Sequence, residues 1–128
     1  MPNIPTAPAQ QLGEAKALYE KGVWHHMRWH TKKAIEAYDE LIERFSSADE
    51  PALRELVVKS LYRTATAHAM RRRTKKAIAV WEGLANRYKS VTDPAICGLA
   101  ARALYMKARS LICGFRGLRT GVRIDCGH

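Results

Sequence analysis

The sequence has few of the features that define several common classes of protein. It contains three cysteines in 128 residues, Cys97, Cys113 and Cys126. An odd number argues against a disulfide framework and suits free thiols in a reducing compartment. No apolar run approaches the roughly 18 residues that a membrane span requires, and the N-terminal residues lack the basic and apolar segments of a signal peptide. We therefore predict a cytoplasmic protein that has no membrane partner.

Catalytic motifs are also lacking. The sequence contains no glycine-rich phosphate loop, no HExxH, no CxxC and no Ser-His-Asp set that helical register would bring together. His26 and His30 are four residues apart, a spacing that would let two imidazoles share a helix face and reach one metal ion. No carboxylate or cysteine lies close by to complete the shell, and the positions 43 residues later are Ala69 and Arg73. We predict a protein that is not an enzyme and that carries neither a metal nor a cofactor.

Composition indicates one folded unit with an uneven charge. Hydrophobic residues make up 47% and charged residues 27% of the chain, the usual balance of globular proteins, and the length suits one domain or a short repeat array. The net charge is +10. Residues 1–55 contain 7 Lys and Arg against 9 Asp and Glu, whereas residues 56–128 contain 15 against 3. Electrostatic interactions are therefore expected in the second half.

An internal repeat is the strongest signal in the chain. The segment 31–35, TKKAI, returns at 74–78, a shift of 43 residues. The same shift relates the Leu-Tyr pair at 18–19 to the pairs at 61–62 and 104–105. Repeated matches at one offset indicate copies of a single structural unit.

Each copy has helical periodicity. Apolar residues recur at steps of three and four along one face, and strand-like alternation is absent. Thr31 and Thr74 are expected to act as helix N-caps, and Pro51 and Pro94 are expected to open helices at the first position. These signals predict five helices, near residues 12–29, 32–46, 51–72, 75–89 and 94–113.

The repeat also predicts how the chain is divided. Residues 1–11 are expected to form a flexible N-terminal arm, and residues 12–113 a helical repeat domain made of the copies 12–54, 55–97 and the partial copy 98–113. Residues 114–121 contain three glycines where a second helix should follow, and glycine costs about 1 kcal/mol relative to alanine in a helix. We predict an irregular basic tail at residues 114–128. A repeat cannot bury its apolar face alone, so the last helix must be covered by the tail, by self-association, or by further chain of a longer protein.

Small and aromatic residues occupy recurring positions within the copies. They are Gly22, Ala65 and Ala108 in the first helix, Ala34 and Ala77 in the second, and Tyr38 and Trp81 one turn later. This pattern resembles the tetratricopeptide repeat (TPR) family, although the period is 43 residues where the family has about 34 and Trp29 and Arg72 replace the usual glycine between the helices. The resemblance implies an all-α fold, a TPR-like α-α superhelix (solenoid) of about two and a half helix-turn-helix repeats.

The resemblance also implies a binding surface, because the first helix of each repeat lines the concave face in that family. The matching residues here are Lys16, Tyr19, His26, Met27, Lys59, Tyr62, Thr66, Met70, Arg102, Tyr105 and Arg109. Cations beside amphipathic rings suit an extended or helical peptide with acidic residues, although the tyrosines could instead only pack one helix against the next. We predict a non-enzymatic protein–protein interaction scaffold whose peptide or protein partner is acidic.

A run of cations offers an alternative function. It comprises Arg71, Arg72, Arg73, Lys75 and Lys76, and Arg116, Arg119 and Arg123 continue it in the tail. The run is either a solvated turn or a contact for nucleic acid or another polyanion. Aromatic residues do not interleave with it as a stacking platform requires, which disfavours nucleic acid.

Overall fold

The structure, a computed structural model, describes the backbone of residues 8–119 and the side chains of residues 9–112. Within this range the chain is all-helical and has no strand. The five helices are α1 (Pro8–Met27), α2 (Thr31–Phe45), α3 (Pro51–Met70), α4 (Thr74–Tyr88) and α5 (Pro94–Arg119). The predicted all-α class and the order of the five helices are confirmed. None of the described helices combines the length and apolar character needed to cross a membrane.

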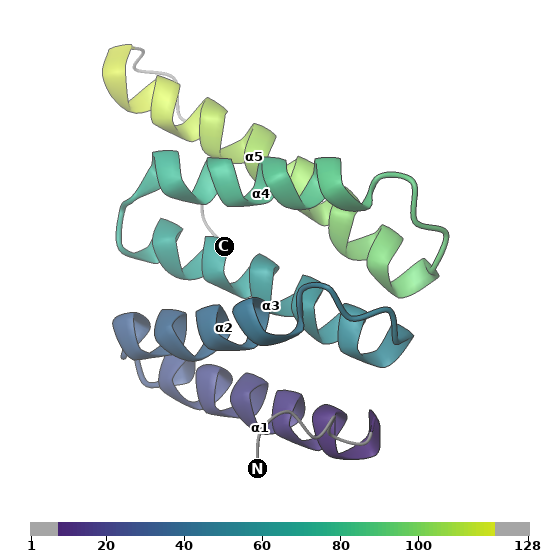
Figure 1. The fold of residues 1–128 in the computed structure, drawn as a ribbon. Coiled ribbons are helices and arrows are strands. Elements are labelled where there is room, and N and C mark those ends of the chain that lie inside the picture. Colours follow the sequence, from purple (N-terminus) through teal and green to yellow (C-terminus); the bar gives the residue numbers. More distant parts are fainter. Residues whose placement is uncertain (1–7, 120–128) are drawn as a thin grey trace.

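The helices stack in chain order (Figure 1). Each helix packs against its neighbour in sequence, and α3 also contacts α1 and α5. The backbones of α2 and α4 do not come close to one another. The helices α1, α3 and α5 therefore adjoin as a row, with α3 at its centre.

The turns that join α1 to α2 and α3 to α4 have the same conformation. Trp29 and Arg72 have positive φ angles of 64° and 61°. In both turns the following residue donates its backbone N–H to the carbonyl five residues earlier, at 2.9 Å. This left-handed closure satisfies carbonyl groups at the end of the first helix. Helices α1 and α3 each have 20 residues and helices α2 and α4 each have 15, so the two hairpins match in length as well.

The loops that follow the hairpins also repeat. Ser46 and Lys89 have identical φ and ψ angles of −64° and −24°. Proline then opens the next helix in both cases. The N–H of Arg54 donates to the Glu50 carbonyl at 2.9 Å in α3, and the N–H of Cys97 donates to the Asp93 carbonyl at 2.8 Å in α5. The backbone thus repeats its conformation every 43 residues.

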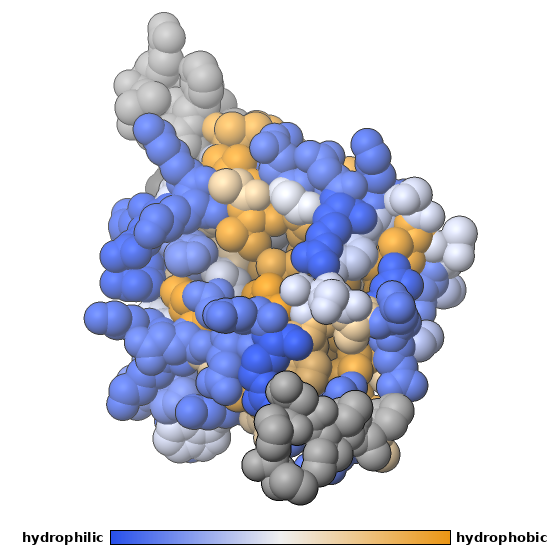
Figure 2. All heavy atoms as spheres, in the orientation of Figure 1, coloured by the Kyte–Doolittle hydropathy of each residue, from blue (hydrophilic) through white to orange (hydrophobic). Residues whose placement is uncertain are grey.

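The core lies where α2 and α4 pack against the row formed by α1, α3 and α5. Tyr38 and Trp81 are both fully buried, and α3 supplies Val57 to one apolar cluster and Val58 to the next. Gly22 packs directly on the Tyr38 ring, since a Cβ atom at this position would lie 2.7 Å from Cδ1 of Tyr38. On the face shown in Figure 2, a strip of apolar residues runs between polar residues that cover much of the surface.

The predicted threonine N-caps are wrong. Thr31 and Thr74 are the first helical residues, and His30 and Arg73 occupy the N-cap positions without a side-chain capping bond. The reason is that each turn is closed by backbone bonds, and the carbonyl of His30 already accepts the first helical bond, at 3.0 Å. The helix therefore starts one residue earlier than the hydroxyl signal suggests.

Two predicted boundaries also differ. Helix α1 begins at Pro8, so residues 8–11 are helical and do not belong to a flexible arm. Helix α5 continues to Arg119, through Gly114 and Gly117, where an irregular tail was expected. A glycine penalty of about 1 kcal/mol weakens a helix without ending it when no proline follows. Residues 1–7 of the predicted arm and 120–128 of the predicted tail lie outside the described residues.

Candidate binding groove

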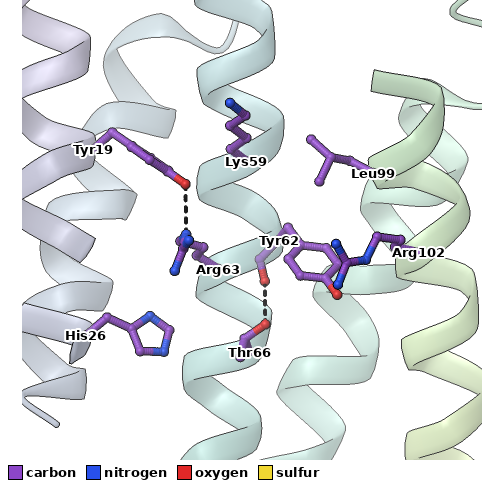
Figure 3. Close-up of a pocket in the computed structure, with 8 residues that line it drawn as sticks. All are labelled: Tyr19, His26, Lys59, Tyr62, Arg63, Thr66, Leu99 and Arg102. Atoms are coloured by element: carbon purple, nitrogen blue, oxygen red, sulfur yellow. Dashed lines mark hydrogen bonds between the residues drawn. The ribbon is translucent and has the colours of Figure 1, made fainter. Parts of the chain in front are cut away.

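A groove of about 440 Å³ lies on the row formed by α1, α3 and α5 (Figure 3). Its volume is within the range of about 300–1,000 Å³ that is typical of ligand sites. Helix α3 contributes residues at steps of three and four, as one face of a helix must. The lining residues are Tyr19 and His26 from α1, Lys59, Tyr62, Arg63 and Thr66 from α3, and Leu99 and Arg102 from α5.

Arg63 of α3 connects this helix to α1 at one side of the groove. Its Nε donates a hydrogen bond to the Tyr19 hydroxyl at 2.8 Å, and its guanidinium lies 5.7 Å from the centre of the Tyr19 ring. Burial alone would lower the pKa of Arg63, but the hydroxyl groups of Tyr19 and Tyr38 raise the pKa above its ordinary value. The groove therefore contains a half-buried guanidinium that is held in place and fully charged.

The groove has a positive charge that its own lining residues do not neutralise. Three of the lining side chains are cations and none is acidic. Lys59 pairs with Glu55 at 2.9 Å, but Arg63 and Arg102 make no ion pair with any carboxylate of the described residues. The Arg102 guanidinium lies 5.5 Å from the centre of the Tyr62 ring, a cation–π distance that fixes its position. The groove is therefore suited to attract a negatively charged group.

The histidine of the groove lies beside Met70 and Tyr38. His26 Nε2 lies 3.1 Å from Met70 Sδ, and burial, followed by the charge of Arg63, lowers the pKa of His26. The Tyr38 ring lies 6.2 Å from that of His26, and burial raises the pKa of Tyr38 to about 12. Both rings are therefore uncharged near neutral pH, and the fixed charge of the groove belongs to its lysine and arginines.

The structure brings together six of the eleven predicted contact residues: Tyr19, His26, Lys59, Tyr62, Thr66 and Arg102. The Thr66 hydroxyl donates to the Tyr62 carbonyl at 3.1 Å, a bond drawn in Figure 3, so it is used within its own helix.

The other five predicted residues do not line the groove; they are Lys16, Met27, Met70, Tyr105 and Arg109. Met70 contacts His26 at the edge of the groove. Tyr105 is 63% exposed on α5, so only two of the three predicted tyrosines line the groove.

Two lining residues were not predicted. Arg63 and Leu99 line the groove, but Arg63 has Glu20 and Met106 at the equivalent positions of the other copies. Arg63 therefore does not recur, and the repeat gives no sign of its role. Helical spacing was the available signal, because Arg63 lies four residues after Lys59 and one after Tyr62.

The basic run lies away from the groove lining. Arg71, Arg72 and Arg73 form the α3–α4 turn, and Lys75 and Lys76 are exposed in the first turn of α4. The contact between His26 and Met70 brings the ends of α1 and α3 together. The α1–α2 turn, with Trp29 75% exposed, is therefore on the same side of the molecule as the basic run. The side chains of the predicted tail arginines lie outside the described residues.

The histidines do not form the pair that their spacing suggested. Helix α1 ends at Met27, so His30 follows the turn and does not share a helix face with His26. Its ring lies 5.8 Å from that of His25 instead. Among the described side chains, no three His, Cys, Asp or Glu residues come close enough to hold a metal ion. Cys97 has a free, exposed thiol, which donates to the Val91 carbonyl at 2.7 Å.

Comparison with models of protein families, with curated proteins and with solved structures finds no match to this chain. The groove is therefore interpreted from its own chemistry. It offers two positioned guanidinium groups, two tyrosine rings and an uncharged histidine within one concave surface.

Proposed function

We propose that the protein is a TPR-like superhelical scaffold of two and a half repeats that binds an acidic peptide or protein segment in the groove, and that it is not an enzyme. The recurring helical hairpins support the proposed family. So do the left-handed φ angles at Trp29 and Arg72, because these are the positions where the family usually has glycine. The odd number of cysteines supports a reducing compartment, the cytoplasm.

The observation that carries the proposal is the pair of guanidinium groups without internal counter-ions. Arg63 is held by Tyr19 and Arg102 by Tyr62, at the two sides of the groove. A guanidinium whose orientation is fixed can bind a carboxylate through two parallel hydrogen bonds. The partner's carboxylates would take these positions, while its apolar atoms would lie against the tyrosine rings.

The test is selection from an unbiased peptide library followed by calorimetry. Selected peptides should be enriched in Asp and Glu, and Arg63→Gln and Arg102→Gln should each weaken the best binder about tenfold to a hundredfold, because hydrogen bonds to charged groups contribute about 1.5–3 kcal/mol. Lys16→Gln is the matched control, since Lys16 is an exposed cation of α1 that does not line the groove, and it should change affinity less than about twofold. Peptides without acidic residues, or an equal loss for Lys16→Gln, would contradict the proposal.

A second candidate function is binding of nucleic acid or another polyanion by the basic run. The observation that favours it is that Trp29 is exposed in the α1–α2 turn, on the same side of the molecule as the α3–α4 turn that contains Arg72 (Figure 1). Base stacking on an aromatic ring beside cations is the usual mode of single-strand binding. Single-stranded DNA should then bind with an affinity that falls steeply between about 50 and 200 mM salt, and it should quench tryptophan fluorescence. Binding that Arg72→Gln and Lys76→Gln leave unchanged would refute this mode.

A further inference from the structure

Helix α5 has an apolar face that no other described element covers. Leu104, Leu111 and Ile112 are exposed by 54%, 48% and 49%, and Tyr105 by 63%. Ala108 lies among them and is also exposed. In Figure 2, apolar residues gather over α5 near the upper edge of the view.

The repeat identifies what such a face does elsewhere in the chain. A shift of 43 residues relates Leu104 and Ala108 to Leu61 and Ala65 of α3. There the face is covered by α4, and Ala65 and Trp81 are both fully buried in one cluster. In the first hairpin the equivalent residue is Gly22, which leaves room for the ring of Tyr38. Twice, therefore, a small residue on this face receives a large aromatic side chain from an amphipathic helix.

The described chain does not return to cover α5. Helices α1 and α3 end at Met27 and Met70, and the next position in this series is residue 113. Helix α5 instead continues to Arg119, past the place where a left-handed turn would start the second helix of the pair. The face that receives a helix in both earlier copies is therefore not covered by any helix of the described residues.

We infer that this face of α5 binds an amphipathic helix of a partner protein, one that places a large aromatic side chain on Ala108 and acidic residues along its flanks. Between residues 94 and 119, α5 has no Asp or Glu. On one flank Lys107 already bonds to Glu82 of the neighbouring helix α4, at 2.8 Å. On the other flank, Arg109 makes no ion pair with a carboxylate of the described residues.

Charge also decides between a partner helix and a second copy of α5. Two α5 helices packed face to face would bring cations together without any carboxylate between them, and like charges at such spacing oppose association. A helix like α2 has the required chemistry, because TKKAIEAYDELIERF combines the aromatic Tyr38 with four carboxylates. This inference does not depend on the groove, which lies on a different face of the same helix row.

The experiment uses a synthetic peptide with the sequence of residues 31–45 as the probe for the full-length chain. Anisotropy of the labelled peptide should show saturable binding, and circular dichroism should show a gain of helix. Leu104→Asp should weaken binding at least about tenfold, since burying one leucine side chain is worth about that much affinity. Replacing Tyr38 by alanine in the peptide should have a similar effect. Met27→Asp is the matched control: Met27 is 73% exposed on α1, and the variant should bind as the unmodified chain does.

Three results would overturn the inference. One is the absence of peptide binding to the folded chain. Another is equal binding by Leu104→Asp, with helicity intact. The third is a dimer of the chain alone that Leu104→Asp dissociates, because a second copy would then be the occupant. Ala108→Trp provides an independent check, since it fills the position reserved for the aromatic side chain and should also weaken binding about tenfold. Failure here leaves the Arg63 and Arg102 result of the groove experiment unaffected.

Discussion

Two glycines of α1 provide a sharp test of how the first hairpin is packed. At Gly22, an added Cβ atom would lie 2.7 Å from Cδ1 and 2.8 Å from Cζ of Tyr38. Tyr38 is fully buried, so its ring has little room to move. At Gly13, in the same helix, an added Cβ atom would have no neighbour within 4 Å. The two positions share the helix and differ only in what the new methyl group meets.

The expected magnitudes follow from this difference. Alanine in place of glycine stabilises a helix by about 1 kcal/mol at either position. At Gly22 the overpacking against Tyr38 opposes this gain by about 3 kcal/mol, the upper end of the usual range, because three atoms of an immobile ring are affected. Gly13→Ala should therefore stabilise the protein by about 1 kcal/mol, and Gly22→Ala should destabilise it by about 2 kcal/mol.

Thermal unfolding followed by circular dichroism separates these outcomes. For a chain of this size we expect a shift of about 4 °C per kcal/mol, so Tm should rise by about 4 °C in Gly13→Ala and fall by about 8 °C in Gly22→Ala. In a Tyr38→Leu background, where the ring is gone, Gly22→Ala should become stabilising. Equal increases in Tm for both single variants would refute the close packing of Gly22 on Tyr38.

Two further predictions concern buried polar groups. Burial lowers the pKa of His26 and His68 from the ordinary 6.5, so the unfolded chain takes up protons first as the pH falls. Stability should therefore decrease below about pH 6.5, and Tm at about pH 6 should be lower than at about pH 7.5, with a smaller difference in His26→Gln. Thr64 is buried and its hydroxyl has no hydrogen-bond partner among the described residues. Thr64→Val should raise the urea-derived stability by about 1 kcal/mol, and a loss of similar size would mean that the hydroxyl has a partner.

Much of the fold follows from periodicity. Helical spacing and the return of TKKAI predicted five helices, and the bounds of α2, α3 and α4 differ from the prediction by no more than two residues. The threonine caps failed because the turns close through backbone bonds that have no distinctive side-chain signature. Helix α5 extends beyond its predicted end because each glycine only lowers the stability of the helix. A proline inside the helix would instead clash with the preceding turn and end it, but the chain has prolines only at the first positions of α3 and α5 in this region.

The groove was predictable only in part. Lys59, Tyr62 and Arg102 could be found because their positions recur in other copies. Arg63 does not recur, and its role depends on a contact with the hydroxyl of Tyr19, which lies on another helix and 44 residues away in sequence; only its helical spacing from Lys59 placed it near the groove. Tyr105 shows the opposite limit. Its position recurs, but no described helix follows α5 to form the other side of a groove at Tyr105.

The two turns at Trp29 and Arg72 have a consequence for how such a chain can diversify. Their shape is maintained by main-chain bonds, while their tips present an indole in one case and a guanidinium in the other. The architecture therefore tolerates very different chemistry at these tips. Each tip is a position at which new specificity can be acquired, or engineered by loop replacement, without redesign of the helices beneath it.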